Sequence, residues 1–257
     1  MLRTDDVTVD GVRSPVLQGG PLAAEEAVVF VHGNPGFSED WRGLSERLSE
    51  FARTIAPDMP GYGNADKPST FDYTVDGYAR HLDGLLTKLG VRRVHLVLHD
   101  FGGAWGLTWA AAHTASLASL TLINIGVMPG YRWHFLARIW RTPVLGEIFM
   151  ATTTRFGFKA LSRIGNPRGL PSDMINRTYD HFDSRTRQAV LRLYRATNDV
   201  GALSERCGNI LKPLNLPTLV IWGRADPYLS AQCHRLARRR GTKKAALAVA
   251  HNILVPT

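Results

Sequence analysis

An aspartate stands where an apolar stretch of the sequence gives way to glycines. The stretch is LVLHDFGGAWG, residues 96–106, and it places Asp100 just before Gly102 and Gly103. A carboxylate at such a point can cap the helix that follows, or it can attack an electrophilic carbon if a sharp turn exposes it. An isolated Asp-x-Gly favours the cap, so the surrounding elements must decide.

Those elements alternate between apolar runs and stretches with helical spacing. Apolar runs that predict buried strands occupy residues 27–33, 93–100, 117–126 and 216–223, and residues 53–63 predict a strand followed by a loop. Residues 40–52 have helical spacing, and we expect Asp40 to cap that helix. The alternation predicts an α/β protein with a mostly parallel sheet flanked by helices. Asp100 then lies at the carboxyl end of a strand, where such sheets bind ligands.

The alternation of predicted strands and helices stops between Val127 and about Cys207. This region is rich in Arg, Phe and Trp and predicts several short helices. An insertion between two strands of one sheet is a cap, not an independent domain. We therefore predict a core of residues 1–126 and 208–257 and a helical cap of residues 127–207.

Five short motifs, taken together, resemble the α/β-hydrolase superfamily over most of the chain. They are HGNPG (32–36), PDMPGYGNADKP (57–68), HDFGG (99–103), WGRADPY (222–228) and AHN (250–252). Most members carry serine at the turn after the strand. Members with aspartate there resemble epoxide hydrolases and haloalkane dehalogenases, in which a carboxylate attacks an sp³ carbon and water opens the resulting ester.

The resemblance implies a role for each polar residue that matches a motif. Asp100 would be the nucleophile, His251 the general base that activates water, and Asp226 the acid that orients His251. The backbone amides of Asn34 and Phe101 would stabilise the oxyanion. Asp226 as a turn residue and His251 as a surface histidine are the alternatives.

Two departures from the family pattern carry expectations of their own. Leu98 is bulkier than the small residue usual two places before the nucleophile, so we expect a less tight turn. The chain ends six residues after His251, where the family normally adds a closing helix. We expect that helix to be missing and His251 to be poorly held; a truncated or frame-altered end would also explain the unusual residues 234–244.

The leaving group separates the two subfamilies. Epoxide hydrolases protonate it with cap tyrosines, and Tyr194 is the better candidate here, with Tyr131 the second. Dehalogenases hold halide with N–H donors, for which Asn34 and a cap tryptophan, Trp133 or Trp140, are available. Phe101 stands where the halide-binding tryptophan belongs and has no N–H to donate. The sequence therefore favours an epoxide hydrolase narrowly over a haloalkane dehalogenase.

Composition and charge limit the other classes. The net charge of +9 is local: six of the 31 basic residues lie in residues 235–244, and the remaining 25 face 22 acidic ones. A basic surface helix explains this better than a nucleic-acid partner. There is no membrane span or leader pattern, and two cysteines make no metal site. We expect a cytoplasmic monomer or homodimer without cofactor or metal that takes water and a small apolar substrate.

A non-catalytic protein that holds a small apolar ligand under the cap is the alternative from another class. It would bind its ligand without turnover, and Asp100→Asn would leave that binding unchanged.

Overall fold

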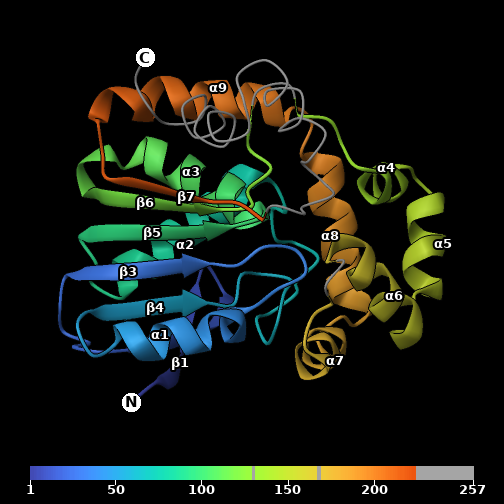
Figure 1. Cartoon of the computed structure of the whole chain (residues 1–257), viewed down its shortest axis with the longest axis horizontal. Helices are drawn as coiled ribbons and strands as arrows, with labels where there is room; N and C mark the ends of the chain where they lie inside the picture. Colours follow the sequence, from blue (N-terminus) through green and yellow to red (C-terminus); the bar gives the residue numbers. More distant parts are fainter. Residues whose placement is uncertain (129–130, 167–168, 224–257) are drawn as a thin grey trace.

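The computed structural model describes residues 1–128, 131–166 and 169–223. In this part of the chain, strands from both ends form one sheet in the order β1-β2-β4-β3-β5-β6-β7 (Figure 1). The strands are β1 (Arg3–Val9), β2 (Val12–Gly19), β3 (Glu26–Val31), β4 (Arg53–Pro57), β5 (Arg93–His99), β6 (Leu117–Ile123) and β7 (Thr218–Ile221). From β4 to β7 all neighbours are parallel, so the predicted mostly parallel sheet is confirmed.

The first two strands form an antiparallel hairpin that the sequence analysis did not predict. Its turn is Asp10-Gly11, and both residues have positive φ, 49° and 78°. Two such residues are what a tight two-residue hairpin turn requires. The hairpin extends the sheet because β2 pairs with β4, also antiparallel.

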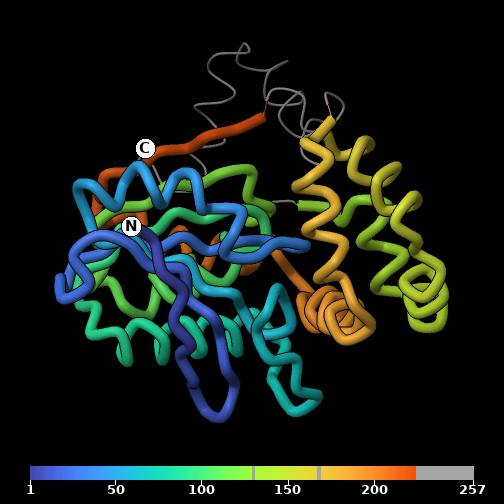
Figure 2. The backbone as a smooth tube through the Cα atoms, turned by 90° about the horizontal axis from the view of Figure 1, so that it is seen from below, coloured from blue at the N-terminus to red at the C-terminus, as the bar shows by residue number. Residues whose placement is uncertain are grey.

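Helices cover both faces of the sheet (Figures 1 and 2). Helix α1 (Arg42–Leu48) lies on one face, and α2 (Val75–Lys88) and α3 (Phe101–Ala112) lie on the other, with α9 (Val200–Leu211) packed against α3. Short 3₁₀ turns are η1 (Ser38–Trp41), η2 (Thr114–Ser116) and η3 (Lys212–Leu214). The main core fills the space between the sheet and α2 and α3, with Leu96, Leu98 and Trp105 fully buried.

Helix α2 illustrates how local sequence sets an element. The side chain of Thr74 accepts a hydrogen bond from the N–H of Gly77 and caps the first turn. The helix ends at Leu89, and Gly90 follows with φ 68°, a conformation that costs glycine little. Between these ends, the buried residues face the sheet.

The segment between β6 and β7 forms a second layer beside the carboxyl edge of the sheet (Figure 1). Its helices are α4 (Phe135–Arg141), α5 (Leu145–Thr152), α6 (Arg155–Gly165), α7 (Ser172–Asp180) and α8 (Ser184–Ala196). We call these five helices the cap. Among the described residues, no helix combines the length and the apolar character needed to cross a bilayer.

Candidate active site

Asp100 is the single residue between β5, which ends at His99, and α3, which begins at Phe101. Its backbone has φ 51° and ψ −123°, a strained conformation for a residue with a side chain. The neighbouring chain comes very close. A Cβ at Gly33 would lie 2.3 Å from Cβ of Asp100, and one at Gly102 would lie 2.3 Å from the carbonyl oxygen of Val31. The two glycines therefore permit the tight turn.

The expectation that Leu98 loosens this turn is wrong. Leu98 is fully buried, and a Cβ at Gly106, on the facing turn of α3, would lie 2.3 Å from its Cδ2. The missing side chain at Gly106 provides the space that Leu98 occupies. Strand β5 and helix α3 can therefore stay close together although the residue two before the aspartate is large.

The loop after β3 binds the carboxylate of Asp100. The backbone N–H of Asn34 donates to Oδ1 of Asp100 at 2.8 Å. Phe101, whose amide is the other expected oxyanion donor, lies in the first turn of α3, where backbone N–H groups have no partner within the helix. The backbone N–H of Asn34 thus contacts Asp100 directly, and Phe101 follows Asp100 in the chain; their role as oxyanion donors stays a prediction.

His32 holds the Asn34 loop in place. Its Nδ1 bonds to the carbonyl oxygen of Gly33 at 2.8 Å, and its Nε2 accepts from the backbone N–H of Met59 at 3.0 Å. Nδ1 therefore carries the proton. Burial lowers the pKa of His32, which keeps the ring neutral. This histidine is a structural link between two loops.

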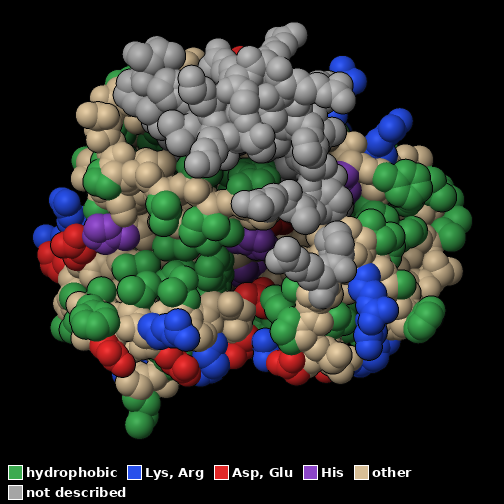
Figure 3. Space-filling model, in the orientation of Figure 1, with side chains coloured by type: hydrophobic (Ala, Val, Ile, Leu, Met, Phe, Trp, Pro, Cys, Tyr) green, Lys and Arg blue, Asp and Glu red, His purple; other side chains and the backbone are tan. Residues whose placement is uncertain are grey.

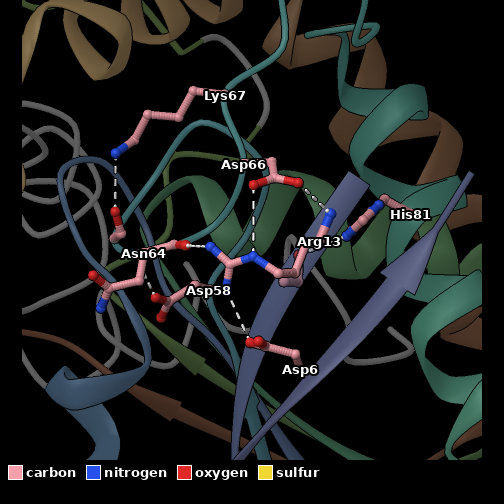
Figure 4. A network of polar contacts seen from close by, with 9 residues as sticks. Asp6, Arg13, Asp58, Asn64, Asp66, Lys67 and His81 are labelled. Atoms are coloured by element: carbon pink, nitrogen blue, oxygen red, sulfur yellow. Dashed lines mark hydrogen bonds and ion pairs between the residues drawn. The ribbon is translucent and has the colours of Figure 1, made fainter. Parts of the chain in front are cut away.

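A polar network fixes the second of these loops, residues 58–67 (Figure 4). Asp58 accepts from the N–H groups of Ser38 and Asn64 at 2.7 and 2.8 Å. Arg13 binds the loop from β2: its backbone N–H donates to Asp66 at 2.9 Å, and its guanidinium donates to the carbonyl of Asn64 at 2.7 Å. Hydrogen bonds of Arg13 and Asp58 thus hold the loop of residues 58–67 in place at the carboxyl edge of the sheet.

A cavity of about 1020 Å³ lies between the carboxyl edge of the sheet and the cap. Figure 3 shows the hollow between these two layers, with histidine and acidic side chains inside it. Asp100, Asn34 and Phe101 line the cavity on the core side, and most of the cap side is apolar or aromatic. The volume is at the upper end of the usual range for small-molecule sites.

Tyr194, on α8, reaches into this cavity. Its hydroxyl accepts a hydrogen bond from Nδ2 of Asn34 at 3.3 Å. Its ring packs edge-on against Phe101 and Trp140, with 4.9 Å between ring centroids in each case. Burial, and then the charge of Asp100, raise the pKa of the Tyr194 phenol well above its usual value. The hydroxyl is therefore a neutral donor at ordinary pH.

The other cap candidates line the same cavity. Nε1 of Trp140 is buried and has no hydrogen-bond partner among the described residues. Tyr131 also lines the cavity, and its ring meets that of Trp133 edge-on at 5.4 Å. Trp133 in turn stacks on Phe101, with ring centroids 6.3 Å apart. The structure therefore brings Tyr194 nearest to Asn34, and gives Trp140 a free N–H donor.

Asp40 is a cavity residue that sequence analysis assigned elsewhere. It is not the N-cap of α1, which begins at Arg42: it lies within η1. Its carboxylate accepts from the N–H of Phe37 at 3.1 Å and lines the cavity, as does His99. Burial by neighbouring atoms raises the pKa of Asp40, and the nearby His32 and His99 oppose that shift. The helical spacing of residues 40–52 gave no signal of this position.

Asp226, His251 and the basic segment 235–244 lie outside the described residues, and so does the end of the chain, on which the expectation of a missing closing helix rests. Within the described ranges, His, Cys, Asp and Glu form no cluster of three or more that could hold a metal ion. The described part of the site thus consists of Asp100 with its strained backbone, the backbone donor of Asn34 and the aromatic side chains of the cap.

The model of the alpha/beta hydrolase fold family matches residues 26–250. The chain belongs to this family. A cis-3-alkyl-4-alkyloxetan-2-one decarboxylase from Xanthomonas campestris pv. campestris is 31% identical over 237 residues, which cover 84% of this chain and 77% of the relative. A haloalkane dehalogenase from Mesorhizobium japonicum is 30% identical over 229 residues, which cover 83% and 73%.

A solved structure supports the same fold. The haloalkane dehalogenase DatA from Agrobacterium tumefaciens C58 superposes with a TM-score of 0.78 at 24% identity, covering 96% of this chain and 85% of that one. The predicted α/β-hydrolase fold is confirmed, and so is the resemblance to the dehalogenase and epoxide-hydrolase branch of the superfamily.

Proposed function

We propose that this α/β-hydrolase opens a strained oxygen-containing ring, with Asp100 as the nucleophile and Tyr194 as the proton donor. One observation carries the proposal: Asn34 contacts both groups. Its backbone N–H binds the Asp100 carboxylate at 2.8 Å, and its side-chain amide binds the Tyr194 hydroxyl at 3.3 Å. Nucleophile and acid therefore face one cavity at a fixed spacing.

For an epoxide, the chemistry has two steps. A carboxylate oxygen of Asp100 attacks a ring carbon, the C–O bond breaks, and the alkoxide takes the phenolic proton of Tyr194. Water then attacks the ester carbonyl while the backbone amides of Asn34 and Phe101 bind the oxyanion. His251, oriented by Asp226, is the candidate base for that water. The product is a diol, the Asp100 carboxylate is regenerated, and the proton that the base takes from water returns to the Tyr194 phenolate.

An oxetan-2-one is a second strained ring that the same carboxylate can open. The relatives from Xanthomonas and Shewanella, 31% and 32% identical, are named for this class of substrate. Attack by Asp100 on C4, the sp³ ring carbon bonded to the ring oxygen, breaks the C4–O bond and frees the carboxylate at C2. Loss of CO₂ then forms a C=C bond and expels Asp100. The products are an alkene and CO₂, and this route needs no water.

A haloalkane is the other candidate substrate, and Trp140 favours it. Its buried Nε1–H has no acceptor among the described residues, and Asn34 supplies a second N–H at the same cavity. Two such donors solvate a departing halide. The dehalogenase from Mesorhizobium japonicum supports this alternative, whereas Phe101 lacks the N–H that a tryptophan there would add. The apolar cap wall suits an apolar substrate in all three cases.

Intact-protein mass spectrometry of His251→Phe tests these routes. The variant is incubated separately with epoxides, haloalkanes and cis-3,4-dialkyloxetan-2-ones, and any adduct is mapped. An epoxide adds its whole mass to Asp100, and a haloalkane adds its mass less that of the hydrogen halide. An oxetan-2-one gives alkene and CO₂ even without His251. If no panel labels Asp100 and the wild type turns nothing over, while a ligand still binds both wild type and Asp100→Asn, the protein is a binding protein instead.

A further inference from the structure

A second cavity opens between the core and the cap, on the side of α8 away from Asp100. Its volume is about 350 Å³. The core contributes Lys67, Ser69 and Tyr73, and α8 contributes Arg185, Gln188 and Arg192. The spacing of three and then four residues places the α8 side chains on one face of the helix. Tyr194, two residues beyond Arg192, points from the other face into the first cavity.

The walls of this second cavity are cationic. Among the described residues, no aspartate or glutamate lines it. The nearest carboxylate contact is at Lys67, whose Nζ lies 3.0 Å from Asp183 and also donates to the carbonyl of Gly63 at 3.0 Å. Asp183 thus neutralises Lys67, and the two arginines keep their charge uncompensated.

The two arginines are prepared for a ligand in different ways. Arg192 is held in position because its guanidinium donates to the carbonyl of Ser69 at 2.6 Å and lies 5.5 Å from the ring centre of Tyr73. Its other N–H groups remain available. The guanidinium of Arg185 makes no hydrogen bond or ion pair with the residues that the structure describes, and its side chain is exposed. One guanidinium is anchored and the other has no partner among the described residues, so the two can bind an anion together.

We propose that this cavity binds a phosphate monoester. Two uncompensated arginines match a dianion in charge, and the planar guanidinium groups match phosphate oxygens in pairs. Gln188 and Ser69 add neutral polar groups, and Tyr73 gives an apolar wall for the organic part of the ligand. The volume accommodates a phosphate with a small organic group and excludes a large one.

A ligand in this cavity would join the cap to the core. The Arg192–Ser69 hydrogen bond already links α8 to the loop of residues 67–73. A phosphate bound by Arg185 and Arg192 of α8 and by Ser69 of the loop would add a bridge between the same two elements. Because α8 also carries Tyr194, phosphate binding would restrain the helix that presents Tyr194 to the first cavity.

Isothermal titration calorimetry with phenyl phosphate and with inorganic phosphate tests the site, in chloride buffer of constant ionic strength. We expect saturable binding of phenyl phosphate at one site and a rise in Tm with ligand concentration. Arg185→Gln should weaken binding about tenfold, because it removes a charged donor. The guanidinium of Arg185 makes no hydrogen bond or ion pair with the described residues and is exposed, so this variant should keep the fold. Arg163→Gln is the matched control, since Arg163 is another exposed cap arginine, on α6.

The proposal would be overturned if the wild type showed no saturable binding of phenyl phosphate, or if Arg163→Gln and Arg185→Gln weakened that binding equally. Binding of inorganic phosphate without binding of phenyl phosphate would also overturn it. Asp100→Asn should bind phenyl phosphate as tightly as the wild type. The outcome is therefore independent of the ring-opening activity. Vesicles containing phosphatidic acid separate a lipid headgroup from a soluble ligand: strong retention of the protein on them, with no binding of phenyl phosphate, would also overturn it.

Discussion

The backbone N–H of Asn34 lies 2.8 Å from Oδ1 of Asp100, although 66 residues separate the two in sequence. This hydrogen bond joins the end of β3 to the end of β5, which are neighbouring parallel strands. It holds the carboxylate over the sheet edge while leaving its other oxygen free of any protein donor among the described residues. This placement is what the proposed nucleophile role of Asp100 requires.

The backbone strain at Asp100 predicts an inverted order of stability. At most positions alanine is more stable than glycine, by about 0.5–1 kcal/mol within regular structure. At φ 51° only glycine is unstrained, so Asp100→Gly should exceed Asp100→Ala in free energy of unfolding by about 1–2 kcal/mol. Urea denaturation measures this difference. Both variants lack the carboxylate, so a higher stability of Asp100→Ala would mean that the position is not strained.

The close packing at Gly102 gives a second prediction. A Cβ there would lie 2.3 Å from the carbonyl oxygen of Val31 and 2.6 Å from that of His32. Gly102→Ala must push β3 away from α3, and we expect a loss of about 2 kcal/mol in the free energy of unfolding. The control is Gly43→Ala in α1, where nothing lies within 4 Å. That change should be neutral or stabilising, by up to about 1 kcal/mol.

Tyr194→Phe separates the two kinds of leaving group. The change removes the proton donor but keeps the ring that packs on Phe101 and Trp140. Ring opening of an epoxide should slow about 100-fold or more in kcat, because an alkoxide needs a proton. Halide release from a haloalkane needs none and should change little. Rapid-quench measurement of ester formation on each substrate gives the comparison.

Tyr131→Phe is the matched control for that experiment. Tyr131 lines the same cavity, but Asn34 binds the hydroxyl of Tyr194. If Tyr131→Phe slowed ring opening more than Tyr194→Phe does, the proton donor would be Tyr131 and not Tyr194. The raised pKa of Tyr194 adds a pH test: the phenol stays protonated, so the rate of ring opening should show no alkaline loss due to this residue below pH 10.

The sequence predicted the elements that local patterns define. The apolar runs that became β3, β5 and β6 are short and end in polar or glycine residues, and the aspartate between β5 and α3 has glycines on its helical side. These signals lie within a few residues of one another. The α/β-hydrolase fold and the turn at Asp100 were therefore predictable from the sequence.

Other features depend on contacts between distant segments. The Asn34–Tyr194 hydrogen bond spans 160 residues, and no spacing in the sequence indicates it. The space for Leu98 comes from Gly106 on another element, so the size of Leu98 alone gave the wrong expectation. The hairpin was missed for a different reason: its first strand begins with the polar run Arg3–Asp6, but the Asp10-Gly11 turn was a usable local signal.

A buried histidine beneath the site makes the stability of the fold depend on pH. His81, on α2, is buried, and its Nε2 bonds to Oγ of Ser14 at 2.9 Å. Burial lowers the pKa of His81 from 6.5 to about 4. The folded protein therefore keeps this ring neutral at a pH where the unfolded chain already takes up a proton.

The sign of the effect follows from these two values. Above pH 6.5 both states are neutral at His81, and its contribution to stability is complete. As the pH falls from 6.5 to about 4, the unfolded state gains a proton that the folded state does not, so the free energy of unfolding falls by up to about 3 kcal/mol. Urea denaturation at several pH values measures this slope. His81→Gln, which cannot titrate, should show a shallower slope over the same interval, and an unchanged slope would assign the acid sensitivity to other groups, such as the buried His32.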